Sequence, residues 1–520
     1  MWLSNILIEL NFSYSHKDLS QVYESDGNHM RTYILKKIYS KTIFLTLICI
    51  FIDITPISLQ AEQKNCFNSD VTKKWSQIID KQVQNIGVNK SDLGIVFYYN
   101  GSELFSTNSN KMMIPASITK IATTAAVFDQ LENLNKLETK FATNGTIEND
   151  ILKGDLYLIG GGDPSFVSES LWYLINVLTR TGIKKIEGNL IIDDSYFDDI
   201  RFDESRESVR VDRAYDSPVG AMSLNWNTIN IFLRPGDNIG AKAKAITDPE
   251  SDYVELVNNL KTGSKTDYSV ERKYNTKTKK DTIIVSGKID LKSPEIAVYK
   301  GVSDPISWVG ANVISFLKQR NISLSGSIQT GKAPTSIKIL AKSESKPLEY
   351  IVADMDKFSN NYVAEMLTKN LSAYKYGQGT LAKGIELIKE TLNKAGVTSQ
   401  EFELYNPSGF TRENKFTPNS MIKILEMMRK DFRIFSHFLN ALPISGVDGT
   451  LKNRMKNGNA RRWIRAKTGL LTGVNTLAGY MGLENGEVIT FVLIHNGPQD
   501  GAKVRSSFDN LLNNLTEKLN

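Results

Sequence analysis

This 520-residue sequence is poor in the residues that hold metals and disulfides, with four histidines and two cysteines. So few ligands leave little material for zinc sites, iron–sulfur clusters or a disulfide framework. The net charge is only +6, from 63 basic and 57 acidic residues, and it is spread along the chain. The sequence has no basic clusters and no RNA-binding aromatic motifs, so we do not expect nucleic acid as a partner. We therefore expect chemistry that uses no metal and no cofactor.

A long hydrophobic run is also missing. The run Ile43–Ile52 is about half of the roughly 20 residues that a membrane-spanning helix needs. Basic residues precede this run and the small residue Ala61 follows it, which is typical of a secretory signal peptide over 30–61. We expect cleavage after Ala61, a periplasmic or other extracytoplasmic location and no stable membrane span, with an uncleaved anchor as the alternative. Residues 1–29 then form an upstream extension, and Met30 is the true start.

Cleavage there would leave 459 residues with two histidines and one cysteine, and the charge would stay at +6. The composition, 41% hydrophobic and 23% charged, indicates an ordinary globular protein of about three structural units. Hydrophobic periodicity predicts a strand hairpin and a helix within 62–150, short β-rich runs over 151–339, and helices followed by a strand hairpin and a last helix over 340–520. We interpret the middle range as one or two inserted β-rich subdomains, and the whole as an α/β (α+β) protein.

Nucleophilic catalysis by serine is the chemistry for which the sequence offers candidates. It has no Gly-x-Ser-x-Gly elbow, so a lysine is the alternative activating base. The motif Ser-x-x-Lys places both side chains on one face of a helix. It occurs five times, beginning at Ser117, Ser315, Ser343, Ser372 and Ser420. Only the first copy stands at a Pro-led helix start, where backbone N–H groups favour a developing oxyanion.

Two further motifs follow Ser117 and Lys120 in order. Ser359-Asn360-Asn361 immediately precedes a predicted helix, and Lys467-Thr468-Gly469 lies in a strand-like stretch. A second Lys-Thr-Gly at 261–263 stands in polar surroundings, and we interpret it as a solvated loop. Each motif alone is weak, whereas the ordered triple is specific.

The ordered triple resembles that of penicillin-binding proteins. The 242-residue interval from Ser117 to Ser359 is similar to that of the class C low-molecular-mass penicillin-binding proteins, the D-alanyl-D-alanine carboxypeptidase/endopeptidase family. The matching stretches are GDLYLIGGGDPS (154–165), SPVGAMSLNWN (217–227), FSNNYVAEML (358–367), LPISGVDGTLKNR (442–454) and RAKTGLLTGVNTLAGY (465–480). The stretch NPSGFTREN (406–414) departs from the family pattern, and we assign it no specific chemistry. The resemblance implies a serine β-lactamase/transpeptidase-like domain, an antiparallel sheet flanked by helices.

The resemblance also implies catalytic roles. Ser117 would be the acylated nucleophile and Lys120 its general base. Ser359 would relay a proton to the leaving D-alanine nitrogen. Asn361 would hold the substrate amide beside Lys120.

The remaining roles fall on the Lys-Thr-Gly strand. Lys467 would be a fixed positive charge that keeps Lys120 neutral and attracts the terminal carboxylate, to which Thr468 would bond. Gly469 would let the substrate backbone lie along the strand. The N–H groups of Ser117 and Leu470 would form the oxyanion hole.

The partners that this resemblance implies are peptidoglycan stem peptides and β-lactam antibiotics, with a homodimer as one candidate assembly. The reaction would release terminal D-alanine or split a D-alanyl-diaminopimelyl crosslink. Two alternatives remain: a β-lactamase or esterase on the same fold, and a non-catalytic cell-wall-binding protein.

Overall fold

The computed structural model describes residues 69–131, 136–205, 214 and 217–520, and residues 70–520 form one compact unit. The upstream extension, the signal peptide and its cleavage site, all predicted above, lie outside the described residues. Within the described ranges no helix combines the length and the apolar character that crossing a bilayer requires.

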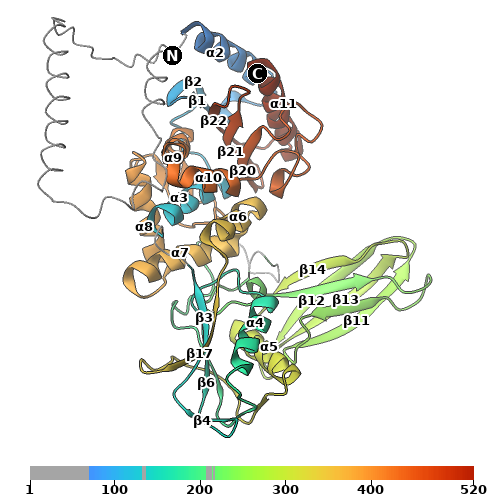
Figure 1. Cartoon of the computed structure of the whole chain (residues 1–520). Coiled ribbons are helices and arrows are strands. Elements are labelled where there is room, and N and C mark those ends of the chain that lie inside the picture. The colour runs from blue at the N-terminus through green and yellow to red at the C-terminus, as the bar shows by residue number, and fades with distance from the viewer. Residues whose placement is uncertain (1–68, 132–135, 206–213, 215–216) are drawn as a thin grey trace, which may run out of the picture. The chain divides into compact units, whose positions relative to one another are not determined.

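The central sheet has five antiparallel strands in the order β2-β1-β22-β21-β20 (Figure 1). Their bounds are β1 (Leu93–Tyr99), β2 (Ser102–Thr107), β20 (Ile464–Leu471), β21 (Val474–Gly482) and β22 (Val488–Asn496). The turn between β1 and β2 is Asn100-Gly101, and both residues have positive φ, as a tight hairpin turn requires. Because β1 pairs with β22, the sheet joins the first and last strands of the described chain.

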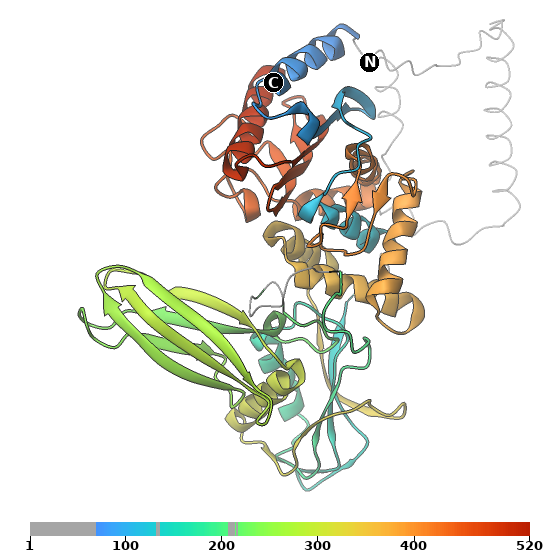
Figure 2. The ribbon, with the colours of Figure 1, turned by 180° about the vertical axis from the view of Figure 1, so that it is seen from behind.

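Side chains of these strands alternate between two cores, one on each face of the sheet. On one face, Phe97 and Leu493 pack with α2 (Ser69–Gln84) and α11 (Gly501–Leu519), which lie side by side in Figure 2. On the other face, Val96 and Ile494 pack with a layer of helices. The bounds of these helices are α3 (Lys120–Gln130), α6 (Leu348–Phe358), α7 (Asn361–Tyr376), α8 (Leu381–Lys394), α9 (Pro418–Lys430) and α10 (Phe432–Ala441).

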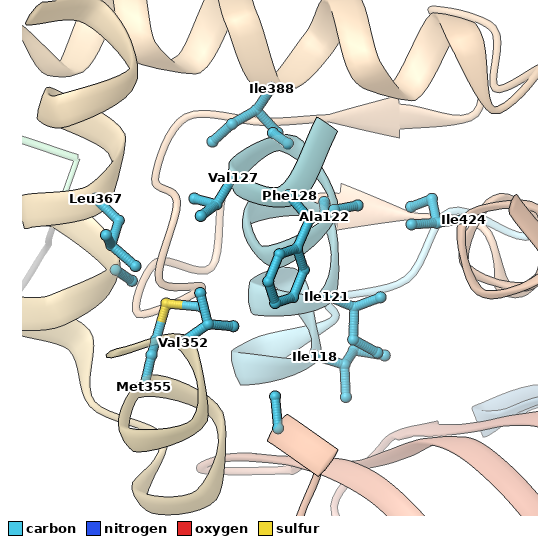
Figure 3. Close-up of a cluster of buried hydrophobic side chains, with 14 of the residues drawn as sticks. Ile118, Ile121, Ala122, Val127, Phe128, Val352, Met355, Leu367, Ile388 and Ile424 are labelled. Atoms are coloured by element: carbon cyan, nitrogen blue, oxygen red, sulfur yellow. The ribbon is translucent and has the colours of Figure 1, made fainter. Parts of the chain in front are cut away.

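Helix α3 is the centre of that second layer. Its residues from Lys120 to Phe128 are all buried, as expected of a core helix, and the polar members Lys120, Thr123 and Thr124 have hydrogen-bond partners there. Figure 3 shows Ile121 and Phe128 of α3 among side chains from α6, α7, α8 and α9. The predicted fold class, an antiparallel sheet flanked by helices, is therefore confirmed.

Between α3 and α6 the chain builds further sheets of its own. Their strand orders are β16-β8-β6-β3-β17, β15-β7-β5-β4, β10-β9-β14 and β11-β13-β12. The elements are β3 (Glu138–Thr143), β4 (Thr146–Glu148), β5 (Ile151–Lys153), β6 (Leu156–Ile159), α4 (Ser168–Thr179), β7 (Lys185–Ile186), β8 (Leu190–Asp193), β9 (Thr228–Arg234), β10 (Lys244–Asp248), β11 (Val254–Gly263), β12 (Asp267–Asn275), β13 (Lys280–Asp290), β14 (Ile296–Gly301), α5 (Pro305–Gln319), β15 (Ser323–Leu324), β16 (Ile328–Thr330) and β17 (Lys338–Glu344). This segment buries a separate apolar core around Trp308.

The interpretation of 261–263 as a solvated loop is wrong. These residues end strand β11, which pairs in parallel with β13 along its whole length. The polar stretch hides the strand because alternate residues of β11 face solvent, while Leu260 and Thr262 are buried. This second Lys-Thr-Gly remains far along the chain from the central sheet.

Candidate active site

Ser117 lies in a single 3-10 turn, η2 (Ala116–Thr119), and α3 begins at Lys120. The prediction placed the serine at the start of the α-helix itself. In the structure it lies in the 3-10 turn immediately before that helix. Ala116 has φ 49, a left-handed conformation that costs energy in any residue with a Cβ. The Thr119 hydroxyl donates to the Ala116 carbonyl at 2.8 Å and holds this tight turn.

The Lys120 side chain is fully buried, and its amine lies next to Ser117. Its Nζ lies 3.3 Å from Ser117 Oγ, and it donates to Asn361 Oδ1 at 2.7 Å. It also donates to the Ser408 carbonyl oxygen at 2.7 Å. The first two motifs therefore meet at one nitrogen atom, although 241 positions separate the two residues.

Ser408 is a site residue that sequence reasoning missed, since it belongs to the 406–414 loop. Gly409 offers the signal that could have found it: its φ is 75, and a Cβ there would lie 2.0 Å from the Ala116 carbonyl oxygen. A glycine that follows Pro-Ser indicates a tight turn, and here that turn packs directly under the serine.

The connection between α6 and α7 carries the second motif. Ser359 ends α6 with φ 55, and this left-handed residue turns the chain so that α7 can begin at Asn361. Asn360 caps α7, because its side chain accepts a hydrogen bond from the Val363 N–H at 3.2 Å. Ser359 Oγ then accepts a hydrogen bond from Lys467 Nζ at 2.8 Å.

Strand β20 carries the third motif along the edge of the central sheet. Gly469 lies so close to the nucleophile turn that a Cβ there would be 2.9 Å from the Ser117 nitrogen. The Thr468 hydroxyl donates to Thr450 Oγ1 at 2.8 Å, in the turn η5 (Gly449–Leu451). Leu470 is 58% exposed and follows immediately. The structure thus brings all eight predicted residues into one neighbourhood.

Two buried ionisable groups set the electrostatics of this neighbourhood. Burial lowers the pKa of Lys467 to about 8, and the charge of Asp356 opposes that change. Burial raises the pKa of Asp356 to about 6, with Lys467 as the strongest opposing charge. Asp356 is a second residue that sequence reasoning missed, although it lies one turn before Ser359. Burial therefore favours the neutral form of Lys467, and the Asp356 carboxylate favours its ammonium form.

The arrangement offers a hydroxyl beside a buried amine, a second hydroxyl beside a buried cation, and backbone N–H groups at a strained turn. These are the parts of an acyl-transfer site. Among the described residues no group of three or more His, Cys, Asp or Glu side chains could hold a metal ion.

Comparison with known proteins agrees with this geometry. The sequence profile of the D-Ala-D-Ala carboxypeptidase 3 (S13) family matches residues 75–515. The chain is 27% identical over 414 residues to the D-alanyl-D-alanine carboxypeptidase of Actinomadura sp. strain R39, covering 76% of each. It is 27% identical over 445 residues to the D-alanyl-D-alanine carboxypeptidase DacB of Haemophilus influenzae, covering 83% of this chain and 88% of that protein.

A solved structure supports the fold. The crystal structure of penicillin binding protein 4 from Haemophilus influenzae superposes with a TM-score of 0.71 at 24% identity. It covers 84% of this chain and 99% of that one. From the match along most of its length, the chain belongs to the D-Ala-D-Ala carboxypeptidase 3 (S13) family and is a serine-type hydrolase.

Proposed function

We propose that this protein releases terminal D-alanine from peptidoglycan stem peptides through an acyl-enzyme at Ser117. The observation that carries the proposal is the contact of Ser117, Asn361 and Ser408 with one buried amine, Lys120 Nζ. Family membership gives the reaction class, and this contact supports the assignment of Ser117 as the nucleophile and Lys120 as its base.

In the first step, neutral Lys120 takes the Ser117 proton while Oγ bonds to the penultimate carbonyl carbon. The oxygen of that carbonyl becomes negative and is stabilised by the N–H groups of Ser117 and Leu470. Ser359 Oγ passes its proton to the leaving nitrogen as the C–N bond breaks, and it takes in return the proton held by Lys120, which becomes neutral again. Lys120 then takes a proton from a water molecule as the water oxygen attacks the ester carbonyl. It gives that proton to Ser117 Oγ as the ester bond breaks, and the shortened peptide leaves.

Substrate is held by groups beside this path. Lys467 attracts the terminal carboxylate, and Thr468 redirects its hydroxyl from Thr450 toward that carboxylate. Asn361 uses its amide Nδ2 toward the substrate, since its Oδ1 is engaged by Lys120. Gly469 leaves room for the peptide backbone next to Ser117.

The same site would also cleave peptide crosslinks and react with β-lactams. Splitting a D-alanyl-diaminopimelyl crosslink needs the same acyl-enzyme with a different leaving amine. A related crystal structure of penicillin binding protein 4 from Haemophilus influenzae is a complex with a β-lactam, which supports β-lactam binding here. A relative in Dictyostelium discoideum, 24% identical, is named a penicillin-sensitive carboxypeptidase.

The proposed place of action is outside the cytoplasm, where stem peptides are. The predicted signal peptide over 30–61 with cleavage after Ala61 would deliver the enzyme there. The homodimer stays a prediction, which light scattering on the purified protein would check. The division into 62–150, 151–339 and 340–520 stays a prediction as well.

The test is labelling with a fluorescent penicillin, with the adduct located by mass spectrometry. We expect one adduct on Ser117 in the wild type and none in Ser117→Ala. The matched control is Ser315→Ala, which removes the serine of another Ser-x-x-Lys copy, on α5, and should label like the wild type. Unlabelled wild-type protein, or labelled Ser117→Ala, would contradict the proposal.

A second measurement separates the proposed peptidase from the alternatives. Release of D-alanine from a pentapeptide, together with slow turnover of the bound penicillin, is expected of the carboxypeptidase. Fast penicillin hydrolysis without D-alanine release would instead indicate a β-lactamase. A protein that binds cell wall and does neither would be non-catalytic.

A further inference from the structure

Asp356 is a buried acid that none of the steps above uses. It lies in the last turn of α6, three residues before Ser359, and its side chain is fully buried. Its Oδ2 accepts a hydrogen bond from the Thr124 hydroxyl at 2.7 Å. Thr124 is on α3, one turn after Lys120, so this bond joins the turns that hold two of the motifs.

The second oxygen of this carboxylate is equally informative. Asp356 Oδ1 is buried and has no hydrogen-bond partner within the part of the chain that the structure describes. A buried carboxylate oxygen without a partner is costly, because water no longer solvates its charge. Such a group persists where a nearby charge compensates, or where it serves a reaction.

The charges around Asp356 are cationic and come from three elements. Burial has the largest effect on the pKa of Asp356, and among the charges Lys467 of β20 has the strongest effect, followed by Lys120 of α3 and then Lys357 of α6 itself. Lys357 already has a counter-charge, because its Nζ lies 2.7 Å from Asp448 Oδ2. Because Lys357 is already paired, the charge of the Asp356 carboxylate acts mainly on Lys467 and Lys120, the two lysines of the proposed reaction.

Those two lysines need opposite protonation states. A neutral amine keeps two N–H donors and one lone pair. Asn361 Oδ1 and the Ser408 carbonyl oxygen can take the two donors of Lys120, which leaves its lone pair for the Ser117 hydroxyl. Lys467 must instead remain cationic to attract a carboxylate, although its side chain is fully buried.

We infer that Asp356 is a positioning residue whose buried carboxylate keeps Lys467 protonated while Lys120 acts as the base. Its hydrogen bond to Thr124 also fixes α6, and with it Ser359, against α3. This inference rests on the proposed function, since it concerns the lysines of the same site. The sign follows from the charges: a negative neighbour stabilises the ammonium form, so losing that neighbour lowers the pKa of Lys467.

The test is the pH profile of acylation in Asp356→Asn, which keeps the shape and an oxygen for Thr124. The second-order rate with a fluorescent penicillin is measured from about pH 5 to about pH 10. We expect the alkaline limb of the profile to move down by about one pH unit or more. The matched control is Asp281→Asn, which removes an equally buried acid on β13. That variant should lose stability without moving the limb.

The outcomes separate this inference from the proposed function. If the wild type is not acylated, or Ser117→Ala is, the proposed function fails. If the wild type is acylated and folded Asp356→Asn keeps the wild-type alkaline limb, the role of Asp356 alone is overturned.

If Asp356→Asn does not fold, the wild type still gives an answer. The ¹⁵Nζ resonance of Lys467, assigned with Lys467→Arg, is followed as pH changes. A coupled pair requires a step near the pKa of about 6 of Asp356 in addition to the main step near about 8. A single step near the higher value would overturn the inference.

Discussion

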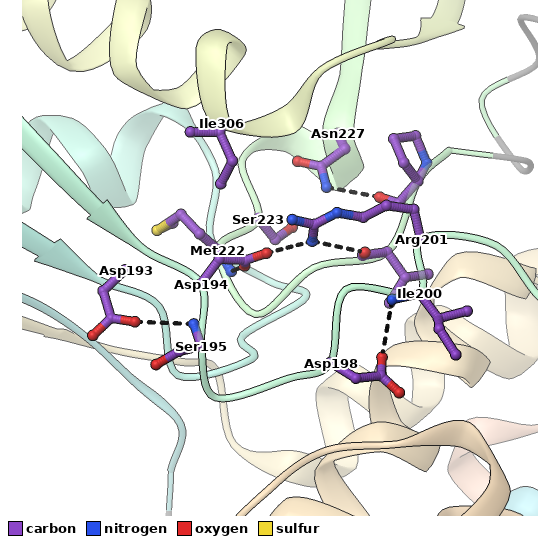
Figure 4. Close-up of polar contacts among 12 residues, drawn as sticks. Asp193, Asp194, Ser195, Asp198, Ile200, Arg201, Met222, Ser223, Asn227 and Ile306 are labelled. Atoms are coloured by element: carbon purple, nitrogen blue, oxygen red, sulfur yellow. Dashed lines mark hydrogen bonds and ion pairs between the residues drawn. The ribbon is translucent and has the colours of Figure 1, made fainter. Parts of the chain in front are cut away.

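Two polar clusters of this protein, each with at least one fully buried lysine, are built in opposite ways. The first is the reaction cluster of Lys120, Lys467 and the oxygens they bind. The second, which we call the α7 clamp, consists of Asp194, Asp198 and Arg201 from the loop after β8, with Lys369 of α7. Figure 4 shows three of its members, with Arg201 directed at Asp194. In the clamp each cation contacts a carboxylate, Arg201 with Asp194 and Lys369 with Asp198.

The reaction cluster uses neutral partners where the clamp uses charged ones. The oxygens within hydrogen-bond distance of Lys120 Nζ belong to an amide, a carbonyl and a hydroxyl. Those that accept from Lys467 Nζ come from a hydroxyl and a carbonyl. A direct ion pair locks the proton on the lysine, whereas neutral acceptors allow it to move. The difference indicates that the clamp holds structure and the reaction cluster moves protons.

Replacing one buried lysine of each cluster, Lys120 and Lys369, by methionine should show the difference between the clusters most clearly. Lys120→Met removes the proposed base, so we expect acylation to slow by about 10² to 10⁴-fold. Lys369→Met leaves Asp198 without its cation and should destabilise the fold by about 3 kcal/mol. Its folded fraction should still be acylated within about twofold of the wild-type rate.

Stopped-flow acylation and urea unfolding of both variants provide the measurements. The comparison fails if Lys369→Met loses acylation as fully as Lys120→Met while it remains folded.

Gly409 should have the next largest effect, because it packs under the nucleophile turn. Gly409→Ala places a Cβ 2.0 Å from the Ala116 carbonyl oxygen, so the turn that carries Ser117 must shift. We expect acylation to slow by about 10 to 100-fold, since small misplacements of reacting groups are costly. The control is Gly396→Ala, which has the same φ of 75 and open space around it.

Both alanine variants should lose about 1–2 kcal/mol of unfolding free energy, because alanine is strained in the left-handed conformation, and urea unfolding measures this loss. Only Gly409→Ala should also change the acylation rate. Equal acylation in the two variants would show that the 406–414 loop does not position Ser117.

The fold class could be predicted because its signals are local. A short stretch of sequence is enough to recognise the hairpin at Asn100-Gly101. The same is true of the apolar strands and helices near the two ends of the chain. The strand at 261–263 could not be recognised in this way, since its pairing with β13 is parallel and its exposed residues are polar. A parallel partner some thirty positions away leaves no turn signal between the strands.

The candidate site was predictable only where a motif marks it. Ser117, Ser359 and Lys467 stand in short ordered motifs, and the structure brings them together. Ser408 contributes only its carbonyl oxygen, which every residue type has, so side-chain patterns do not reveal it. Asp356 acts through space from beneath the site, and one acid among 57 acidic residues carries no signal of its burial.

The pH dependence should sharpen the comparison by showing that the charge on Lys467 can be lost. Its pKa of about 8 means that the ammonium form is present below that pH and disappears above it. With a substrate that ends in a carboxylate, we expect kcat/KM to fall as pH rises through about 8, by about tenfold for each further unit. D-alanine release from a pentapeptide measures this.

The control for the pH profile is the same peptide with an amidated C-terminus. It has no carboxylate for Lys467 to attract, so its kcat/KM should be lower and should lack this limb. Identical limbs for the two peptides would mean that the limb does not report carboxylate binding.

Thr450 should show the smallest effect, because it holds Thr468 by a hydrogen bond between neutral groups. In the free site Thr450 Oγ1 accepts from the Thr468 hydroxyl at 2.8 Å, and once that hydroxyl turns to the substrate carboxylate, the Thr450 hydroxyl can donate to Thr468 Oγ1 in return. Thr450→Val removes this return bond, so the Thr468 hydroxyl loses its fixed orientation toward the carboxylate. One such bond contributes about 1 kcal/mol, so KM for the pentapeptide should rise about fivefold while kcat stays unchanged. Thr450→Ser keeps the hydroxyl and should restore the wild-type KM. A lower KM in Thr450→Val would instead show that Thr450 competes with the substrate carboxylate for this hydroxyl. Neutral contacts in the reaction cluster would then restrain the site, as the ion pairs of the α7 clamp do.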